Sequence, residues 1–383
     1  MKKLFSSFLV ILLSSCSTND IIYNRFSKPT LLEEIHYLSD CDDKIDFEPI
    51  DLFSSNLAKQ LINNSDNSLF SPLSLYLLDS MLGDINPNEK LLNNLGISSV
   101  KELDLINNAI LNKHKDNVSN SLWFDDNLDV YKDPIQKLAV NYYASSYQMD
   151  FANEDNLNYL SSWVNQKTNN LLDVNNKDLG IDTDTIMAII NTLYVIDNWQ
   201  SPLNVKKGIK FKGVNGDEET DFLTKTTSFY TSSDEYEAVR LSTRNNHLDI
   251  YLPHEEFDLT SVVSDSLLKE AIPLKEGLNV DVFFPRFAIK NSLDLTTINR
   301  DITDIEFISG LSPTVIQVNK VMQNNYLSVD ENGLEATTAS SFSGYGAAPM
   351  DDNTFELIIN RPFLFVLRDD LDLPLYVGSV VRL

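Results

Sequence analysis

The stretch that decides the fold lies near the C-terminus and reads VDENGLEATTASS (residues 329–341). It begins with the alternation of a strand, passes Gly333 and continues mainly in small residues. The next thirteen residues, FSGYGAAPMDDNT (342–354), contain two glycines and a proline. Because glycine and proline are typical of turns and exposed segments, the sequence predicts a strand that leads into an exposed loop.

The side chains after Gly333 alternate with the period of two of a β-strand. One face is uncharged and contains Leu334, Ala336, Thr338, Ser340 and Phe342. The other face contains Glu335, Thr337, Ala339 and Ser341, and Glu335 carries its only charge. No proline interrupts residues 333–348, so this segment can pair as a strand with one face against a core. A surface hairpin without further function is the alternative at this point.

Elsewhere in the chain, helical patterns come early and strand patterns come late. Apolar spacing predicts helices over residues 46–63 and 73–82. IMAIINTLYVI (186–196) is nearly all apolar, which predicts a strand covered on both faces. Further strands are predicted over residues 239–241, 248–252, 278–285, 315–318, 325–329, 357–367 and 375–381. This order of helices and strands indicates an α+β fold with a mostly antiparallel sheet. Because no Pro- or Gly-rich linker follows residue 45, the sequence favours one domain over residues 45–383.

The N-terminus has the pattern of an export signal. Lys2 and Lys3 precede LFSSFLVILL (residues 4–13), which is too short to span a bilayer. The run ends in Leu13-Ser14-Ser15-Cys16, which resembles the bacterial lipobox. We therefore expect residues 1–15 to be a lipoprotein signal peptide, Cys16 to be lipidated, and residues 16–44 to be a tether with one helical turn near residues 31–38. An ordinary signal peptide that contains a cysteine is the alternative.

The anchor predicts where the chain is found. It is expected to be secreted and lipid-anchored to a membrane of the bacterial cell envelope, where it could be exposed at the surface. Cys41 is then the only free thiol, and no motif marks it as a nucleophile. With only two cysteines in the chain, a disulfide framework is excluded.

Composition argues against two classes of function. With 56 acidic and 30 basic residues the net charge is −26, which repels nucleic acid. The glycine-rich nucleotide motifs, the HExxH metal motif and the GxSxG nucleophile motif are absent from the sequence, which contains four histidines. We therefore predict no catalytic residue, no metal ligand and no cofactor.

Six short blocks resemble, in order, those of the serpin family. They are NSLFSPLS (67–74), WVN to Thr168 (163–168), NTLY with Trp199 (191–199), FFPRF (283–287), the segment 329–341 with LIINRPFLFVL (357–367), and LYVG (375–378). The resemblance covers residues 45–383. It implies a large, mostly antiparallel main sheet with smaller sheets, a predominantly helical N-terminal half and an exposed reactive loop at about residues 332–354.

The resemblance also assigns roles to particular residues. It places the hinge of the loop at Glu331, Gly333, Leu334, Glu335, Ala336, Thr337, Thr338 and Ala339, and the buried polar shutter at Ser71, Ser74, Asn191 and Gln323. Counting from Glu331 by the usual loop length places the reactive bond at Ala347-Ala348, with Tyr345 and Met350 as alternatives. Leu334 stands where a small or β-branched residue is usual, which puts the speed of loop insertion in doubt. Gln323 replaces a usual histidine but can still donate and accept hydrogen bonds.

The function that the resemblance implies is inhibition of serine or cysteine endopeptidases as a suicide substrate, by loop cleavage and insertion. No lysine or arginine lies between Lys320 and Arg361, so elastase-like, subtilisin-like or papain-like targets are expected and trypsin-like ones are not. We expect a monomer. A non-inhibitory surface lipoprotein on the same scaffold, which binds a partner, and a hydrolase are the alternatives.

Overall fold

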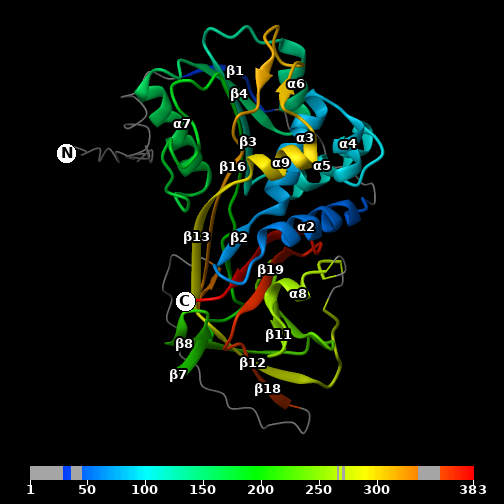
Figure 1. Ribbon diagram of the computed structural model, residues 1–383, viewed down its shortest axis with the longest axis vertical. Helices are drawn as coiled ribbons and strands as arrows, with labels where there is room; N and C mark the ends of the chain where they lie inside the picture. The colour runs from blue at the N-terminus through cyan, green and yellow to red at the C-terminus, as the bar shows by residue number, and fades with distance from the viewer. Residues whose placement is uncertain (1–28, 36–44, 265–266, 270–271, 335–353) are drawn as a thin grey trace, which may run out of the picture.

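The N-terminal half of the chain is mainly helical, as predicted (Figure 1). The computed structural model describes residues 29–35, 45–264, 267–269, 272–334 and 354–383. The helices of this half are α2 (Glu48–Leu61), α3 (Pro72–Ile85), α4 (Glu89–Asn94), α5 (Val100–His114), α6 (Lys132–Asn141) and α7 (Glu154–Lys167). Later in the chain lie α8 (Leu259–Val262) and α9 (Thr296–Thr303). The predicted helices over 46–63 and 73–82 are confirmed as α2 and α3, and no helix in the described ranges is long and apolar enough to cross a membrane.

Local signals fix where α3 begins. The hydroxyl of Ser71 accepts the backbone N–H of Ser74 at 3.1 Å, which caps the helix. Pro72 occupies the first helical position, where an N–H would have no partner within the helix. This start holds Ser71 and Ser74 beside the centre of the molecule.

The prediction of a helical turn near residues 31–38 is wrong for the residues of this range that the structure describes. Thr30–Glu33 forms strand β1, which pairs antiparallel with β4 (Ala144–Met149). Backbone pairing to the open edge of β4 decides this conformation, because four residues are too few to form a stable helix by themselves. Part of the predicted tether is therefore an edge strand of the folded domain. Residues 36–44, in the rest of that region, lie outside the described residues.

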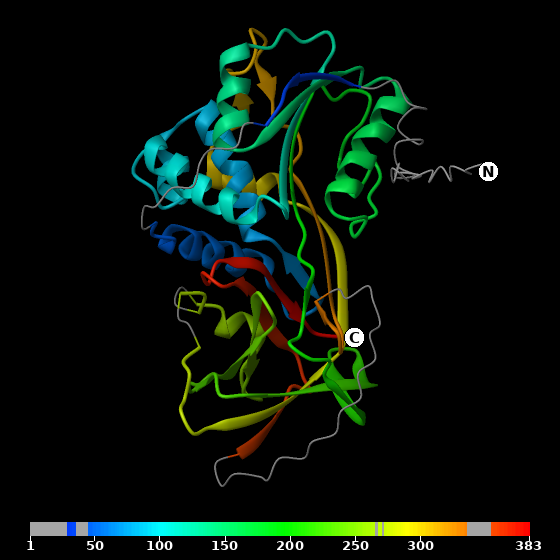
Figure 2. The same cartoon turned by 180° about the vertical axis from the view of Figure 1, so that it is seen from behind.

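Two four-stranded sheets run along the long axis of the molecule (Figures 1 and 2). The first has the order β1-β4-β3-β5, with β3 at Val118–Asp125 and β5 at Met187–Leu193. The second has the order β13-β16-β17-β6, and its strands are Phe287–Asp294, Met322–Val329, Gly333–Leu334 and Asp197–Asn198. Together they form the two halves of the predicted main sheet. The mostly antiparallel α+β class is confirmed, with β3–β4 a parallel pair.

A six-stranded sheet forms the most buried layer. Its order is β2-β20-β19-β11-β10-β9, and its strands are Ser68–Phe70, Pro374–Val380, Phe363–Asp369, Asn246–Pro253, Tyr236–Ser242 and Tyr230–Ser232. Every residue of β19 and β20 is buried. The remaining strands form a sheet of order β18-β12-β8-β7 (Thr354–Ile358, Asn279–Pro285, Gly216–Thr227, Asn204–Gly213) and a pair, β14 with β15 (Phe307–Ile308, Ile316–Gln317).

Two strand predictions need correction. Residues 357–367 form parts of two strands in different sheets, because Pro362 has no N–H to donate and the chain turns before β19. Residues 186–196 contain β5, but its first five residues are only half-buried. Both faces of β5 pack against apolar clusters, Met187 and Ile189 against one and Ala188 and Ile190 against the other. The partial exposure arises because one edge of β5 borders an open space in the middle of the molecule.

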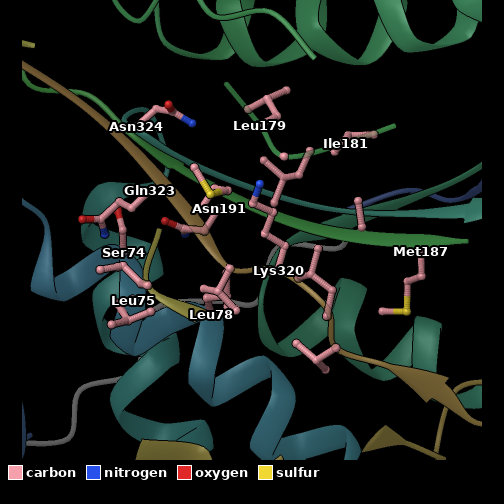
Figure 3. A pocket seen from close by; sticks show the side chains of 18 of the residues that line it. Ser74, Leu75, Leu78, Leu179, Ile181, Met187, Asn191, Lys320, Gln323 and Asn324 are labelled. Carbon is pink, nitrogen blue, oxygen red and sulfur yellow. The ribbon is translucent and has the colours of Figure 1, made fainter. Parts of the chain in front are cut away.

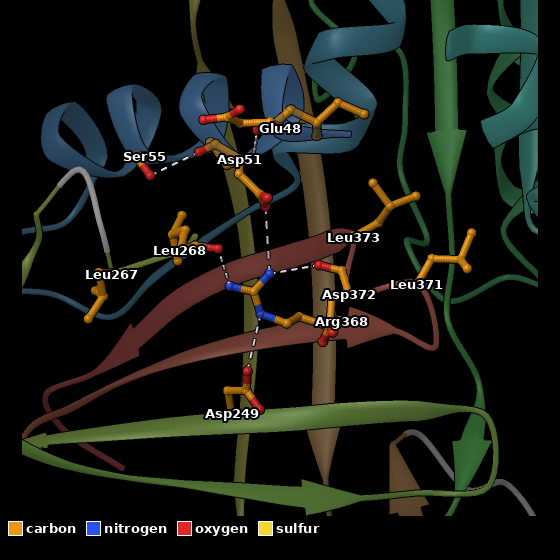
Figure 4. Close-up of polar contacts among 12 residues, drawn as sticks. Glu48, Asp51, Ser55, Asp249, Leu267, Leu268, Arg368, Leu371, Asp372 and Leu373 are labelled. Carbon is orange, nitrogen blue, oxygen red and sulfur yellow. Dashed lines mark hydrogen bonds and ion pairs between the residues drawn. The ribbon is translucent and has the colours of Figure 1, made fainter. Parts of the chain in front are cut away.

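A buried ion cluster joins α2 to the six-stranded sheet (Figure 4). The Arg368 guanidinium donates to Asp249 at 3.1 Å, to the Leu268 carbonyl at 2.6 Å and to the Asp372 carbonyl at 2.7 Å. On α2, the Asp51 carboxylate lies 3.7 Å from Arg368 and is about three quarters buried. Burial outweighs the attraction of Arg368 and raises the pKa of Asp51 from 3.8 to about 6.

Asp51 is expected to make the native state less stable as the pH rises from 4 to 8, with most of the loss between pH 4 and 6. The folded chain binds this proton more tightly than the unfolded chain, so the contribution is present below pH 4 and is lost as the pH passes 6. Asp51→Asn should raise the free energy of unfolding by about 1–2 kcal/mol at pH 8 and by much less at pH 4.5. Denaturation midpoints across this pH range test it. Exposed Asp133→Asn should keep the wild-type pH slope, and an Asp51→Asn profile parallel to wild type would contradict the account.

Candidate functional site

A gap separates β5 from β16 in the middle of the molecule (Figure 3). β5 pairs with β3, β16 pairs with β13, and among the described strands no pairing joins β5 to β16. The space between them is a cavity of about 310 Å³ that both strands line, together with α3 and Val164 of α7. Such facing strand edges offer backbone hydrogen bonds to an additional strand.

One end of the gap is already occupied by β17. Leu334 pairs with Val329 of β16 on one side and with Asp197 of β6 on the other. The gap is thus one strand wide at this end. The Leu334 side chain is fully buried. A Cβ atom on Gly333 would lie 2.1 Å from the Asp197 carbonyl oxygen, so only glycine allows the chain to approach β6 this closely.

The turn before β17 is held on several sides. The Asp330 carboxylate accepts the N–H groups of Asn332 at 2.7 Å and of Gly333 at 3.1 Å. Arg286 forms an ion pair with Glu331 at 2.9 Å, and the Trp199 indole donates to the Asp330 carbonyl at 2.7 Å. These contacts fix the point from which residues 335 onward leave the described structure.

A lysine lies beside this turn. Lys225 Nζ is 5.4 Å from the centroid of the Trp199 ring, and burial lowers the pKa of Lys225.

The structure brings three of the four predicted shutter residues together. Gln323 accepts the Ser71 N–H at 3.0 Å and donates to the Ser71 carbonyl at 2.8 Å. Ser71 in turn caps Ser74. Asn191 lies across the gap on β5, where it donates to Asn120 at 2.7 Å, and its own Oδ1 is buried without a hydrogen-bond partner. The gap therefore contains an unsatisfied acceptor.

The two faces of the gap differ. On β16, Asn325 donates to the Leu69 carbonyl at 3.1 Å, beside α3, whereas Asn324 donates to the Asp178 carbonyl on the opposite face. Tyr326, on the same face as Asn324, packs with the apolar cluster that contains Trp163 of α7. A strand in the gap would thus meet the main core on one face and the α7 cluster on the other.

Several predicted site residues lie outside the described residues. These are Cys16, the hinge residues Glu335, Ala336, Thr337, Thr338 and Ala339, and the reactive-bond candidates Tyr345, Ala347, Ala348 and Met350.

The described residues contain no cluster of three or more His, Cys, Asp or Glu side chains that could hold a metal ion. Buried His114 is 2.9 Å from Asp369, whose other oxygen accepts the N–H groups of Leu371 and Leu373 at 2.9 Å. This pair caps the turn between β19 and β20.

Comparison with known proteins identifies the family. The family model for Serpin (serine protease inhibitor) matches residues 49–383. The chain belongs to the serpin family. Human neuroserpin is 26% identical and the match covers 79% of this chain and 83% of that protein, and an uncharacterized serpin-like protein of Methanosarcina acetivorans is 24% identical over 86% and 84%. The native-state crystal structure of tengpin, a thermophilic serpin, superposes with a TM-score of 0.79 at 21% identity and covers 93% of this chain and 100% of tengpin.

Serpins are generally protease inhibitors that act as suicide substrates, rather than catalysts. Leu334, which the sequence predicts as the first hinge residue, is already fully buried.

Sequence reasoning missed Asp197, which pairs with Leu334. The signal in the sequence is the carboxylate itself, which follows directly after the apolar run 186–196.

Proposed function

We propose that this serpin inhibits serine or cysteine endopeptidases by loop cleavage and insertion of the loop into the gap. The observation that carries the proposal is β17, which already pairs with β16 and β6 as the first two residues of an additional strand. Beyond it, the cavity of about 310 Å³ continues between β5 and β16.

The register of β17 predicts where later loop residues would lie after insertion. In the observed register Leu334 pairs with Val329 and with Asp197. If this pairing continues residue by residue, Ala336 lies opposite Leu327, and Ser340 lies between Gln323 and Asn191. These loop side chains are small and uncharged, as the α3 side of the gap requires. The Ser340 hydroxyl could then donate to the unsatisfied Oδ1 of Asn191.

The chemistry belongs to the target protease. Its serine or cysteine attacks the loop carbonyl, which we assign to Ala347, and the amine of Ala348 leaves. The acyl-enzyme ester or thioester remains on the new C-terminus. Insertion of residues 335–347 would move the bound protease along the sheet and distort its oxyanion site before water can attack.

The loop sequence is expected to exclude trypsin-like targets. No lysine or arginine lies between Lys320 and Arg361, so no bond in the loop presents a basic residue to the acid of a trypsin pocket. The purified chain should form a denaturant-stable complex with elastase, subtilisin or papain, and with trypsin none. A C-terminal fragment that begins at Ala348, identified by mass after denaturation, would support the assigned bond, whereas one that begins at Gly346 or Asp351 would move the bond to Tyr345 or Met350.

The outcomes separate the alternatives for this site. Cleavage by every protease without a stable complex would contradict inhibition and favour a partner-binding role. A stable complex with trypsin would contradict the specificity argument. Hydrolysis of a substrate by the chain itself would contradict both the inhibitory and the partner-binding role.

We also propose that Cys16 carries a lipid anchor that holds the serpin at a membrane of the bacterial cell envelope. Support comes from the apolar run 4–13 and the Leu13-Ser14-Ser15-Cys16 box. Cys16→Ser is expected to move the protein from the detergent phase to the aqueous phase in detergent partitioning, because the attached chains supply the membrane affinity. Cys41→Ser is the matched control and should stay in the detergent phase. Partitioning of both wild type and Cys16→Ser into the aqueous phase would contradict the anchor.

A further inference from the structure

Asp197 is a buried carboxylate with an unusual number of donors. The residue is 2% exposed, and it lies in β6, where its backbone pairs with Leu334. Its Oδ2 accepts the Thr243 hydroxyl at 2.5 Å, the Asn245 N–H at 2.9 Å and the Asn246 side-chain amide at 2.8 Å. Its Oδ1 accepts the Asn198 N–H at 2.9 Å and the Asn245 side-chain amide at 3.1 Å.

Four of these five donors come from one turn. Residues 243–245 connect β10 to β11 in the six-stranded sheet, and Asn246 is the first residue of β11. The Arg244 N–H also donates to the Asn198 carbonyl at 3.0 Å. Strand β6 is therefore attached through Asp197 and Asn198 to the most buried sheet of the molecule, although it pairs in a different sheet.

The distance between β6 and β16 decides whether a strand fits between them. β6 has only two residues, and residues 194–196 separate it from β5, so its own sheet restrains it little. The ring of hydrogen bonds around Asp197 supplies the missing restraint.

We propose that Asp197 is a positioning residue for loop insertion. Asp197 fixes β6 to residues 243–246 and so keeps the gap one strand wide at the end where β17 lies. The cleaved loop can then enter the gap before the acyl-enzyme hydrolyses. The proposal rests on the inhibitory function proposed above. The role of Asp197 requires a carboxylate. An asparagine at this position would direct an NH₂ group at the donors of the turn and leave at least one of them unsatisfied.

Asp197→Asn tests the proposal against a protease that forms a stable complex with the wild type. We expect insertion about tenfold slower, seen as more inhibitor cleaved for each protease molecule trapped, with the rate of the first loop cleavage unchanged. Thr243→Val removes one donor at nearly constant volume and should shift the same ratio less. It keeps the test usable if Asp197→Asn does not fold.

Asp369→Asn is the matched control. Asp369 is also 2% exposed and caps the turn between β19 and β20 with two backbone donors, but it lies away from the gap. Its substitution should lower the melting temperature without changing the ratio of cleaved to trapped inhibitor. An equal rise in that ratio for Asp197→Asn and Asp369→Asn, or an unchanged ratio for both Asp197→Asn and Thr243→Val, would overturn the proposal. If the wild type traps no protease, the inhibitory function fails rather than the role of Asp197.

Discussion

Thr338→Arg is expected to convert the inhibitor into a substrate, which the target protease cleaves without being trapped. The register of β17 places residue 338 opposite Asn325 of β16 and Leu193 of β5. Asn325 is 1% exposed and its side chain donates to the Leu69 carbonyl, so this position faces the core beside α3.

An arginine there would bury a charge without a partner, at a cost of several kcal/mol. Insertion would then be roughly a thousandfold slower, and hydrolysis of the acyl-enzyme would come first. Gel analysis of a timed reaction measures the fractions of cleaved and complexed inhibitor. Ala336→Arg should behave in the same way, because residue 336 lies on the same face of the inserted strand.

Glu335→Arg is the matched control for this prediction. Residue 335 already carries a charge and lies on the opposite face of the strand, so the substitution should leave complex formation within a few-fold of wild type. A stable complex with Thr338→Arg, or its loss with Glu335→Arg, would contradict the proposed faces of the inserted strand.

The sequence was sufficient for the elements with strong local patterns. The apolar spacing of Phe53, Leu57 and Leu61 predicted α2, and the apolar run 375–381 predicted the buried strand β20. The alternation from Leu334 onward predicted which face of the loop should be buried, and the structure buries Leu334, the first residue of that face.

Features set by pairing between distant segments could not be predicted. Thr30–Glu33 becomes a strand only because β4 offers a free edge, more than a hundred residues later in the chain. The division of the main sheet depends on the relative positions of β5 and β16, and no local pattern encodes it. Asp197 looked like one acid among 56, because four of its five donors come from a turn more than forty residues away.

Cleavage of the loop is expected to raise the melting temperature of the chain by about 20 °C. Residues 335–347 would gain roughly ten backbone hydrogen bonds to β5 and β16, each worth about 1 kcal/mol net. For a chain of this size, each kcal/mol corresponds to about 2 °C. Thr338→Arg cleaved at the same bond should gain only a small part of this increase, because its loop cannot enter the gap.

Calorimetry of the intact and the loop-cleaved wild-type chain therefore tests the central claim most directly, since it needs no knowledge of the physiological target. The account predicts that the cleaved chain melts about 20 °C above the intact one, while mass spectrometry shows that the C-terminal fragment stays bound. A cleaved chain that melts at or below the temperature of the intact chain would show that the loop does not fill the gap between β5 and β16.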